Sequence, residues 1–403
     1  MTKTDYDYIV LGCGGIGSGA AYWLSRRAGN AVLGIEQFEL GHHKGGSQDY
    51  SRIIRLAGYG PEHTPLTPHT FKTWGTVEEE SALQIVRKTG GVFWWPKDAP
   101  ERQREYMERT ASAMDAEGIP YDRVDAAEVM RRYPQFHIDE DIEAIIQEDT
   151  GIVDPSKGNA AHQQLARYHG ATILDHCPVE ALHPFDGGVI VETKKGTFTC
   201  RRLVITAGAW VDRILAQLGL QLKVIVTREQ VTYYATPNLR EFAVGNFPIF
   251  LVPTELGAIY GFPIHGEVAT KAAIDMSGKV VTADTRNFDP DVEVEEYQEA
   301  WLKQHIPGFL GPKLYTKTCL YTMPLDRQFI IDTLPGHPQI ILCCGAGHAF
   351  KFASLFGKIL SELAIDGQTQ YPIESMTWHR PAVTDPDNYD SYILQRLQET
   401  GRA

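Results

Sequence analysis

Three glycines near the start of the chain have the spacing of a phosphate-binding turn. Gly12, Gly14 and Gly17 form GxGxxG within the run GCGGIG. The first permits a tight turn, the second lets the backbone approach a pyrophosphate, and the third lets a helix pack closely against a strand. Glu36 follows Gly12 by 24 residues and ends an apolar run, where an acid accepts hydrogen bonds from a ribose diol. We predict a dinucleotide-binding motif; its N-terminal place in a chain of this length favours FAD over NAD.

A second candidate for ligand chemistry is the loop GGSQDYSRIIR. Its residues Gly45, Gly46 and Ser47 are small, so the backbone can pass close to a ligand. Arg52 and Arg55 stand three apart and would share a face in a helical turn. Beside a nucleotide site, one arginine would lie near the cofactor and the other would clamp a substrate carboxylate. A solvated basic turn is the alternative.

Two later turns join an apolar strand to a helix in the same way as the first glycine motif. Ala207 and Gly208 stand in the run RRLVITAGAWVDRILAQLG, where the backbone could approach a nucleotide. Gly345 and Gly347 follow the apolar run QIILCC and precede a helical pattern. A turn of this kind directs helix N–H groups and a positive dipole end at an anion. A flavin ring that has gained electrons is such an anion.

Cys319 stands late in the chain, within TCLYTMPLDRQFIID. A thiolate is a nucleophile, and nearby cations would stabilise it. A buried structural cysteine is the alternative. None of the six cysteines forms a CxxC pair and the 14 histidines include no HExxH, so we expect no metal site. The cysteines also resemble no disulfide framework, which favours a reducing, cytoplasmic location.

Composition narrows the class of partner. The 403 residues carry a formal charge of −13, which disfavours nucleic acid and anionic membranes as partners. No run approaches the roughly 20 apolar residues of a membrane span. The N-terminus has no signal-peptide pattern, and the C-terminal QETGRA is not a peroxisomal address.

The elements that must position these residues alternate between two patterns. Strand, turn and helix recur near residues 5–35, 201–219 and 339–366, and residues 151–174 have the pattern of a turn, a helix from about Pro155 and a strand. Short strands, several with alternation, fill residues 220–318. The fold class predicted is therefore α/β, with a Rossmann-like FAD-binding domain interleaved with an antiparallel-sheet (α+β) substrate domain. The boundaries expected are 1–85, 150–218 and 320–385 for the FAD-binding domain, 86–149 and 219–319 for the substrate domain, and 386–403 for a C-terminal tail.

Taken together, these motifs resemble the monomeric sarcosine oxidase family, which also holds N-methyltryptophan oxidase, pipecolate oxidases and, more distantly, fructosyl amino acid oxidases. The resemblance runs the length of the chain. It rests on GCGGIG with Glu36, on GGSQDYSRIIR, on GFP followed by Lys271, on TCLYTMPLDRQFIID and on GAGHAFKFAS.

The resemblance implies a role for several side chains. Cys319 would carry FAD through a thioether at the flavin 8α carbon, and Tyr321 would line the active site. Lys271 would contact the N5 side of the flavin through water and activate oxygen, because a cation stabilises charge that develops in a dry site. Arg55 and Lys351 would hold the substrate carboxylate.

The resemblance also places Arg52 over the flavin and His348 in the glycine turn near the ring, with no catalytic role for this histidine. Two positions depart from the family pattern. Asp275 stands where sarcosine oxidases carry a histidine four residues after the oxygen-activating lysine, and Gln48 stands where they carry one before the first arginine. Asp275 could bind a second cationic group or sugar hydroxyls of the substrate, or point away from the cavity at a strand edge.

The function implied is an FAD-dependent oxidase of secondary amines, acting on N-methyl, other N-alkyl or cyclic amino acids. A hydride equivalent would pass to flavin N5, O2 would be reduced to hydrogen peroxide, and the imine would hydrolyse. The rate should rise with pH as the amine loses its proton. Fructosyl amino acid oxidation is the alternative that Asp275 supports; a flavin dehydrogenase and a non-catalytic flavoprotein are further ones. The partners expected are a small amine substrate with a carboxylate and O2, and the chain would be a monomer or a weak homo-oligomer.

Overall fold

The structure, a computed structural model, describes residues 3–57, 60–139 and 141–403. An eight-stranded sheet forms one half of the molecule, and its central strands β20, β12, β1, β2 and β9 run parallel. It comprises β1 (Asp5–Leu11), β2 (Val32–Ile35), β9 (Thr172–Leu174), β10 (Val179–Phe185), β11 (Gly188–Thr193), β12 (Gly196–Ile205), β19 (Ile330–Leu334) and β20 (His337–Cys344).

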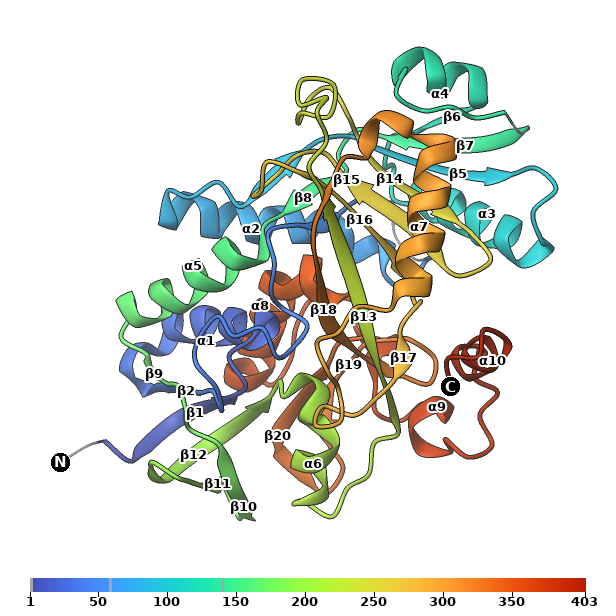
Figure 1. Ribbon diagram of the computed structural model, residues 1–403. Helices are drawn as coiled ribbons and strands as arrows, with labels where there is room; N and C mark the ends of the chain where they lie inside the picture. Colours follow the sequence, from blue (N-terminus) through green and yellow to red (C-terminus); the bar gives the residue numbers. More distant parts are fainter. Residues whose placement is uncertain (1–2, 58–59, 140) are drawn as a thin grey trace.

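Four helices form a layer against this sheet (Figure 1). They are α1 (Gly15–Ala28), α2 (Thr67–Ser81), α5 (Pro155–Tyr168) and α8 (Ala353–Asp366). Small residues set how closely α1 and α8 approach, since a Cβ added at Gly357 would lie 2.3 Å from the carbonyl carbon of Gly19. Ile9 and Val10 of β1 are fully buried, as expected for a parallel strand covered on both faces.

A nine-stranded, mostly antiparallel sheet forms the other half. It comprises β5 (Gly91–Pro96), β6 (Asp122–Val124), β7 (Ile142–Gln147), β13 (Val224–Tyr234), β14 (Ile249–Pro253), β15 (Ala258–Phe262), β16 (Thr270–Asp275), β17 (Lys279–Val280) and β18 (Lys313–Pro324). The helices α3 (Glu101–Ala116), α4 (Ala126–Arg132) and α7 (Val292–His305) accompany it. The long strands β13 and β18 pair antiparallel over 11 residue pairs and run from one half of the molecule toward the other (Figure 1).

The remaining elements connect or cover these two halves. A three-stranded sheet joins β3 (Arg52–Ile54), β8 (Gly151–Val153) and β4 (Val86–Lys88) in the order β3-β8-β4. The short helix α6 (Val211–Ala216) follows β12, and α9 (Pro381–Thr384) and α10 (Tyr392–Glu399) close the chain. The predicted α/β class with an interleaved antiparallel sheet is confirmed. We propose that the two large sheets mark two interleaved domains.

Two local expectations were wrong. Arg52 and Arg55 do not share a helical turn: Arg52 begins β3, and Arg55 follows directly after it. The isoleucines at 53 and 54 favour an extended backbone, because β-branched side chains pack well on a pleated surface. The run from Gly151 is likewise the strand β8 rather than a simple turn. Both arginines nevertheless line one cavity.

The described residues include neither a helix that could span a membrane nor a cluster of metal-ligating side chains. None of the helices within 3–57, 60–139 and 141–403 is both long enough and apolar enough to cross a bilayer. Over the same residues, no three His, Cys, Asp or Glu side chains cluster in a way that could hold a metal ion. The six cysteines are all buried and free.

Candidate active site

A cavity of about 1100 Å³ is lined by residues of both large sheets. This volume is at the upper end of the range for ligand sites, roughly 300–1,000 Å³, so there is room for more than one small ligand. The predicted site residues on its wall are Gly12, Gly14, Glu36, Ser47, Arg52, Arg55, Ala207, Gly208, Asp275, Tyr321, Gly345, Gly347, His348 and Lys351. Gly17, Lys271 and Cys319 do not line it, and the two side chains are buried nearby.

The glycine motif forms a turn in which side chains would not fit. Gly12 has φ +91° and donates its N–H to the carbonyl of Ile35 at 2.8 Å. A Cβ at Gly17 would lie 1.7 Å from the carbonyl oxygen of Gly12. Helix α1 begins after Gly14 with no side-chain cap. Its first N–H groups are therefore available to a phosphate at the cavity wall.

Glu36 follows directly after β2, beside this turn, and is 5% exposed. Its carboxylate accepts the backbone N–H of Cys13 at 3.0 Å and that of Phe38 at 3.1 Å. Each oxygen keeps further acceptor capacity, because an ionised carboxylate offers about four lone-pair sites. The Ala207–Gly208 turn contributes to the same cavity wall.

The loop before β3, which lines part of the cavity, packs against β18. Gly46 lies so close to β18 that an added Cβ would be 2.7 Å from the carbonyl oxygen of Leu320. Gln48 donates from Nε2 to the carbonyl of Thr318 at 2.9 Å, one residue before Cys319. Ser47 lies over the start of α1, because its Oγ would be 3.4 Å from a Cβ at Gly14. Gln48 therefore holds the loop against the strand and does not line the cavity.

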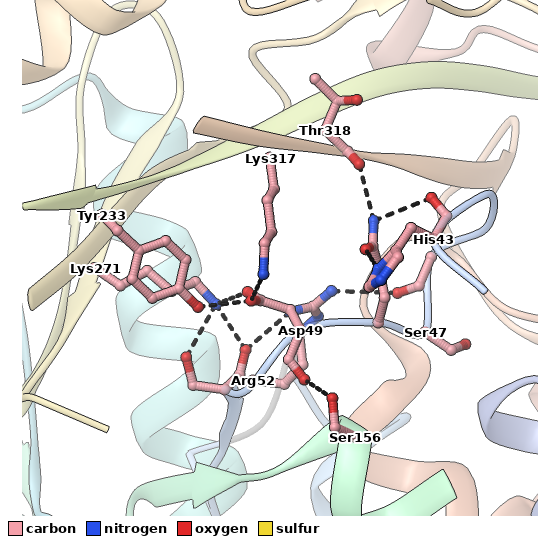
Figure 2. A network of polar contacts seen from close by, with 12 residues as sticks. His43, Ser47, Asp49, Arg52, Ser156, Tyr233, Lys271, Lys317 and Thr318 are labelled. Carbon is pink, nitrogen blue, oxygen red and sulfur yellow. Dashed lines mark hydrogen bonds and ion pairs between the residues drawn. The ribbon is translucent and has the colours of Figure 1, made fainter. Parts of the chain in front are cut away.

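Asp49 is the centre of a buried polar network between this loop and the nine-stranded sheet (Figure 2). Lys271 Nζ lies 2.7 Å from Asp49 Oδ2, and the Tyr233 hydroxyl donates to Oδ1 at 2.6 Å. Arg52 and Lys317 approach the same carboxylate at 3.4 and 3.7 Å. Asp49 also has φ +93°, a conformation that few residues other than glycine adopt and that Asp and Asn tolerate best. The fold thus holds this acid at a strained position.

Burial and neighbouring charges shift the pKa values of Lys271 and Asp49 in this network. Burial lowers the pKa of Lys271 to about 8, although Asp49 opposes this shift. Burial raises the pKa of Asp49, but Lys271 and Arg52 outweigh it and leave that pKa below its usual value. Lys271 also donates to the carbonyl and the hydroxyl of Ser51, at 2.8 and 3.0 Å. Asp49 is thus what keeps a buried lysine largely charged near neutral pH.

Cys319 lies on β18, opposite Glu229 of β13. Burial raises the pKa of the Cys319 thiol, and the charge of Arg52 opposes that change. Glu229 is buried; it accepts the N–H of Ser277 at 3.1 Å, and burial raises its pKa to about 7. In a strand, residues two apart face the same side, so Cys319 and Tyr321 share a face of β18.

The turn after β20 brings cations and aromatic rings to the cavity. Gly347 has φ +80°, and a Cβ there would lie 2.6 Å from the Tyr321 ring. Lys351 is 5% exposed and donates from Nζ to the carbonyl of His348 at 2.7 Å. Burial and the charge of Lys351 lower the pKa of His63 to about 4, so this cavity residue is neutral at pH 7. Arg55 is 5% exposed on the same wall, and its guanidinium lies over the Phe93 ring.

Asp275 lies on the cavity wall and does not point away from it. Both of its oxygens accept from Arg327 Nη2, at 2.8 and 2.9 Å. Arg327 has φ +56° and also lines the cavity. The carboxylate is therefore already matched by a guanidinium, in contrast to the expectation of an acid open to a cationic or sugar-bearing substrate.

Sequence reasoning missed five residues that this geometry makes prominent. They are Asp49, His63, Glu229, Arg327 and Arg396. Asp49 stands inside the quoted loop, three residues before Arg52, so its proximity to the arginines could have been noticed. Arg327 also stands inside a quoted run, TCLYTMPLDRQFIID, whereas His63, Glu229 and Arg396 reach the site from segments far from these motifs in sequence.

The residues present fit a flavin dinucleotide. The glycine turn leaves the space that a pyrophosphate needs, Glu36 stands where a ribose lies, and the cavity continues past Arg52 to Tyr321. Gly345 and Gly347 give a second close backbone approach, with Lys351 beside it.

Comparison with known proteins also indicates an FAD-binding protein. Residues 7–363 match the FAD dependent oxidoreductase (DAO) family. Monomeric sarcosine oxidase from Bacillus sp. (strain B-0618) is 31% identical over 95% of this chain and 98% of its own length. N-methyl-L-tryptophan oxidase from Escherichia coli O157:H7 is 30% identical over 93% of this chain and 99% of its own length.

Solved structures give the same result for the fold. An open form of NikD, an unusual amino acid oxidase essential for nikkomycin biosynthesis, superposes with a TM-score of 0.81 at 27% identity, over 93% of this chain and 98% of that one. L-proline dehydrogenase from P. horikoshii shares the fold, with a TM-score of 0.81 at 20% identity over 95% and 99% of the two chains. The chain belongs to the FAD dependent oxidoreductase (DAO) family and is an FAD-dependent amine oxidoreductase related to monomeric sarcosine oxidase.

Proposed function

We propose that this protein oxidises the secondary amine of an N-methyl, other N-alkyl or cyclic amino acid and passes the electrons to O2. The observation that carries the proposal is the pair of buried cations, Arg55 and Lys351, on the wall of the cavity that also holds the glycine turn. The relatives named as oxidases of sarcosine and N-methyltryptophan support it.

The protein's own residues would bind and orient the substrate. Arg55 and Lys351 would hold the carboxylate, because a guanidinium and an ammonium match its two oxygens. Tyr321 would pack against the substrate, held in place by Gly347. His63 is neutral at pH 7, so it would leave the carboxylate to these two cations. Bound FAD would supply the two-electron chemistry itself.

Lys271 would assist the reduction of oxygen. The substrate amine loses two electrons and two protons to become an imine, O2 takes up the same number to become hydrogen peroxide, and water hydrolyses the imine. Negative charge that develops on oxygen is stabilised by a cation in a site that excludes water. Asp49 supports this role by keeping the lysine charged.

Cys319 would carry the flavin covalently through its sulfur. Arg52, Lys271 and Arg286 lie close enough to affect its electrostatics, and each cation favours the thiolate form of Cys319. The thioether would replace a C–H bond at the flavin 8α carbon by a C–S bond; the two electrons released would reduce the flavin, and O2 would reoxidise it to give hydrogen peroxide. Gln48 supports the same role, because it fixes the neighbouring carbonyl of Thr318. Acid precipitation tests the bond: a thioether leaves the yellow chromophore with the protein, whereas free FAD passes into the supernatant.

The remaining parts of the proposal concern the protein's surroundings. Six free thiols support a reducing, cytoplasmic compartment. A monomer or a weak homo-oligomer is proposed, which sedimentation at two protein concentrations would test. Neither nucleic acid nor membrane is proposed as a partner, in view of the charge of −13.

Fructosyl amino acid oxidation is a weaker alternative. Asp275 was its main support, and Arg327 already occupies both carboxylate oxygens. A flavin dehydrogenase is weaker too, because the buried Lys271 favours oxygen as the acceptor. A flavoprotein that only binds its cofactor would have little use for two buried cations on the cavity wall.

Peroxide production tests the proposal. The purified flavoprotein would be supplied with sarcosine, longer N-methyl amino acids, pipecolate, proline and a fructosyl amino acid, in air-saturated buffer. We expect at least one secondary amine to yield one peroxide per amine oxidised. Turnover of the fructosyl compound alone would favour the alternative, and the absence of peroxide with every amine would refute the proposal.

A further inference from the structure

The cavity wall beyond Asp275 carries three arginines, and one of them has buried N–H groups without an acceptor in the described part of the chain. Arg327, Arg102 near the start of α3 and Arg396 of α10 all contribute to this wall. Arg396 interacts electrostatically with Asp275, Arg327 and Arg102, so the four charges lie in one neighbourhood. We call Arg102, Arg327 and Arg396 the arginine cluster. One carboxylate, Asp275, lies within it.

Arg327 pairs with that carboxylate in a bidentate contact. The two hydrogen bonds from its Nη2 reach both oxygens of Asp275. Arg396 is left without an equivalent partner: its Nε and Nη2 are buried and form no hydrogen bond with any described residue. Burial of a guanidinium without an acceptor is costly, and the cost is relieved when an anion binds.

Arg102 also lacks a carboxylate partner among the described residues. Its guanidinium lies 4.7 Å from the centre of the Tyr392 ring, and it forms no ion pair within the described part of the chain. A guanidinium stacked on a ring keeps its edge free for a carboxylate. The stacking also ties the start of α3 to the start of α10.

The other acids on the wall do not pair with the cluster. Asp326 is paired with Arg380, whose Nε lies 2.5 Å from its Oδ2. Glu105 and Glu399 are exposed and form no ion pair with the described residues. The buried N–H groups of Arg396 therefore lack an acceptor among these residues, in the same cavity that Arg55 and Lys351 line.

The cluster is continuous with the proposed substrate site. Arg327 Nε lies 3.5 Å from the carbonyl of Ala346, between Gly345 and Gly347. Asp275 also influences the electrostatics of Tyr321, the residue that contacts Gly347. Arg55, Lys351 and Arg396 line the same cavity, so a ligand held by the first two could extend along this wall toward Arg396.

We infer that the preferred substrate is an N-substituted amino dicarboxylic acid, whose side-chain carboxylate binds Arg396 and Arg102 while its α-carboxylate binds Arg55 and Lys351. This inference rests on the proposed function and adds the class of side chain. An unpaired Asp275 would instead favour a cationic or sugar-bearing substrate, but this carboxylate is paired with Arg327.

Matched substrates that differ in one charge test it. N-methyl-glutamate and N-methyl-glutamine have nearly the same shape, and only the first carries a second carboxylate. We expect kcat/KM for the acid to exceed that for the amide by at least about tenfold, the effect of a charged hydrogen bond. Arg396→Gln should abolish that preference, by lowering kcat/KM for the acid far more than kcat/KM for the amide.

Arg109→Gln is the matched control, because Arg109 also lines the cavity but is already paired with Glu62 at 3.0 Å. It should keep the preference for the acid. Equal kcat/KM for acid and amide in the wild type would overturn the inference while leaving the proposed function intact, since both would still be oxidised. An unchanged preference in Arg396→Gln would overturn it too.

Binding to the unmodified flavoprotein gives a readout that needs no variant and no turnover. Glutarate and glutaramate share one carboxylate and differ only in the second group. We expect glutarate to bind at least about tenfold more tightly, measured by the change it causes in the flavin absorption band. Equal binding would overturn the inference even if no amine were oxidised, whereas tighter glutarate binding with no turnover would uphold the anion site and count against the proposed function.

Discussion

Replacing Asp49 by Asn tests whether this acid sets the charge of Lys271. The change removes the carboxylate that lies 2.7 Å from Lys271 Nζ and keeps an oxygen for the hydroxyl of Tyr233. Asn also tolerates a positive φ, so the backbone at +93° should be retained. The perturbation is therefore mainly electrostatic.

The size of the effect follows from the buried pair. Removing one partner of such a pair costs about 3–5 kcal/mol, and each pKa unit corresponds to about 1.4 kcal/mol. The pKa of Lys271, about 8 in the wild type, would fall below ~6. At pH 7.5 the charged fraction would drop from about three quarters to about 3%, so a step that needs the ammonium would slow roughly 20-fold.

The assay is reoxidation of the reduced flavoprotein by O2, followed in a stopped-flow instrument after photoreduction without substrate. In the wild type the rate should fall as pH rises through about 8, where Lys271 loses its proton. In Asp49→Asn the same fall should occur below pH ~6. Tyr233→Phe is the control, because it removes the other hydrogen bond to Asp49 and keeps the ion pair. A pH profile of Asp49→Asn that coincides with the wild type would refute the reasoning.

Three further changes test other parts of the site. Cys319→Ala should leave all flavin extractable by acid; flavin that stays with the variant would show attachment elsewhere. Arg55→Ala should raise the apparent Kd of an N-methyl amino acid about 10- to 100-fold and leave that of its methyl ester nearly unchanged, as measured by anaerobic titration; an equal effect on both would separate Arg55 from the carboxylate. Because burial raises the pKa of Glu229 from 4.5 to about 7, the folded protein binds the extra proton between these values, and the free energy of unfolding should decrease by on the order of 3 kcal/mol as pH rises across them. Glu229→Gln should flatten this dependence in urea unfolding at pH 5 and 7, and an identical slope in the variant would contradict the assignment.

The sequence is enough to predict the dinucleotide motif, because its parts are local. Gly12, Gly14 and Gly17 lie in one turn, and the apolar runs on either side have the periods of a strand and a helix. The alternating strands of β13 to β16 were predictable for the same reason. Both features depend on residues that are close together in the sequence, so a local pattern is enough to predict them.

Other parts of the site depend on contacts that no local pattern encodes. Asp49 meets Lys271 only because β16 pairs with β13 and the loop before β3 packs against them. The extended backbone at Arg52 was mistaken for a helical turn, because a spacing of three residues fits both interpretations until strand pairing is known. Arg396 reaches the cavity from a segment expected to be a tail.

The ion-pair partner of Asp275 is a further contact that no local pattern encodes. Strand alternation left two orientations of Asp275 open, one toward the cavity and one away from it. Its partner could not be predicted, since Arg327 comes from the turn after β18, 52 residues later. The pair changes the interpretation of the site, because a matched carboxylate no longer attracts a cation.

Anaerobic reduction of the flavin by a secondary amino acid tests the central claim most directly. The purified flavoprotein would be mixed without oxygen with an N-methyl amino acid, its methyl ester and the corresponding primary amine. We predict loss of the visible band of oxidised flavin with the N-methyl acid, at a rate at least about tenfold above that of the ester, in which the contact with Arg55 and Lys351 is lost. No reduction by any secondary amine, or equal rates for acid and ester, would contradict the account.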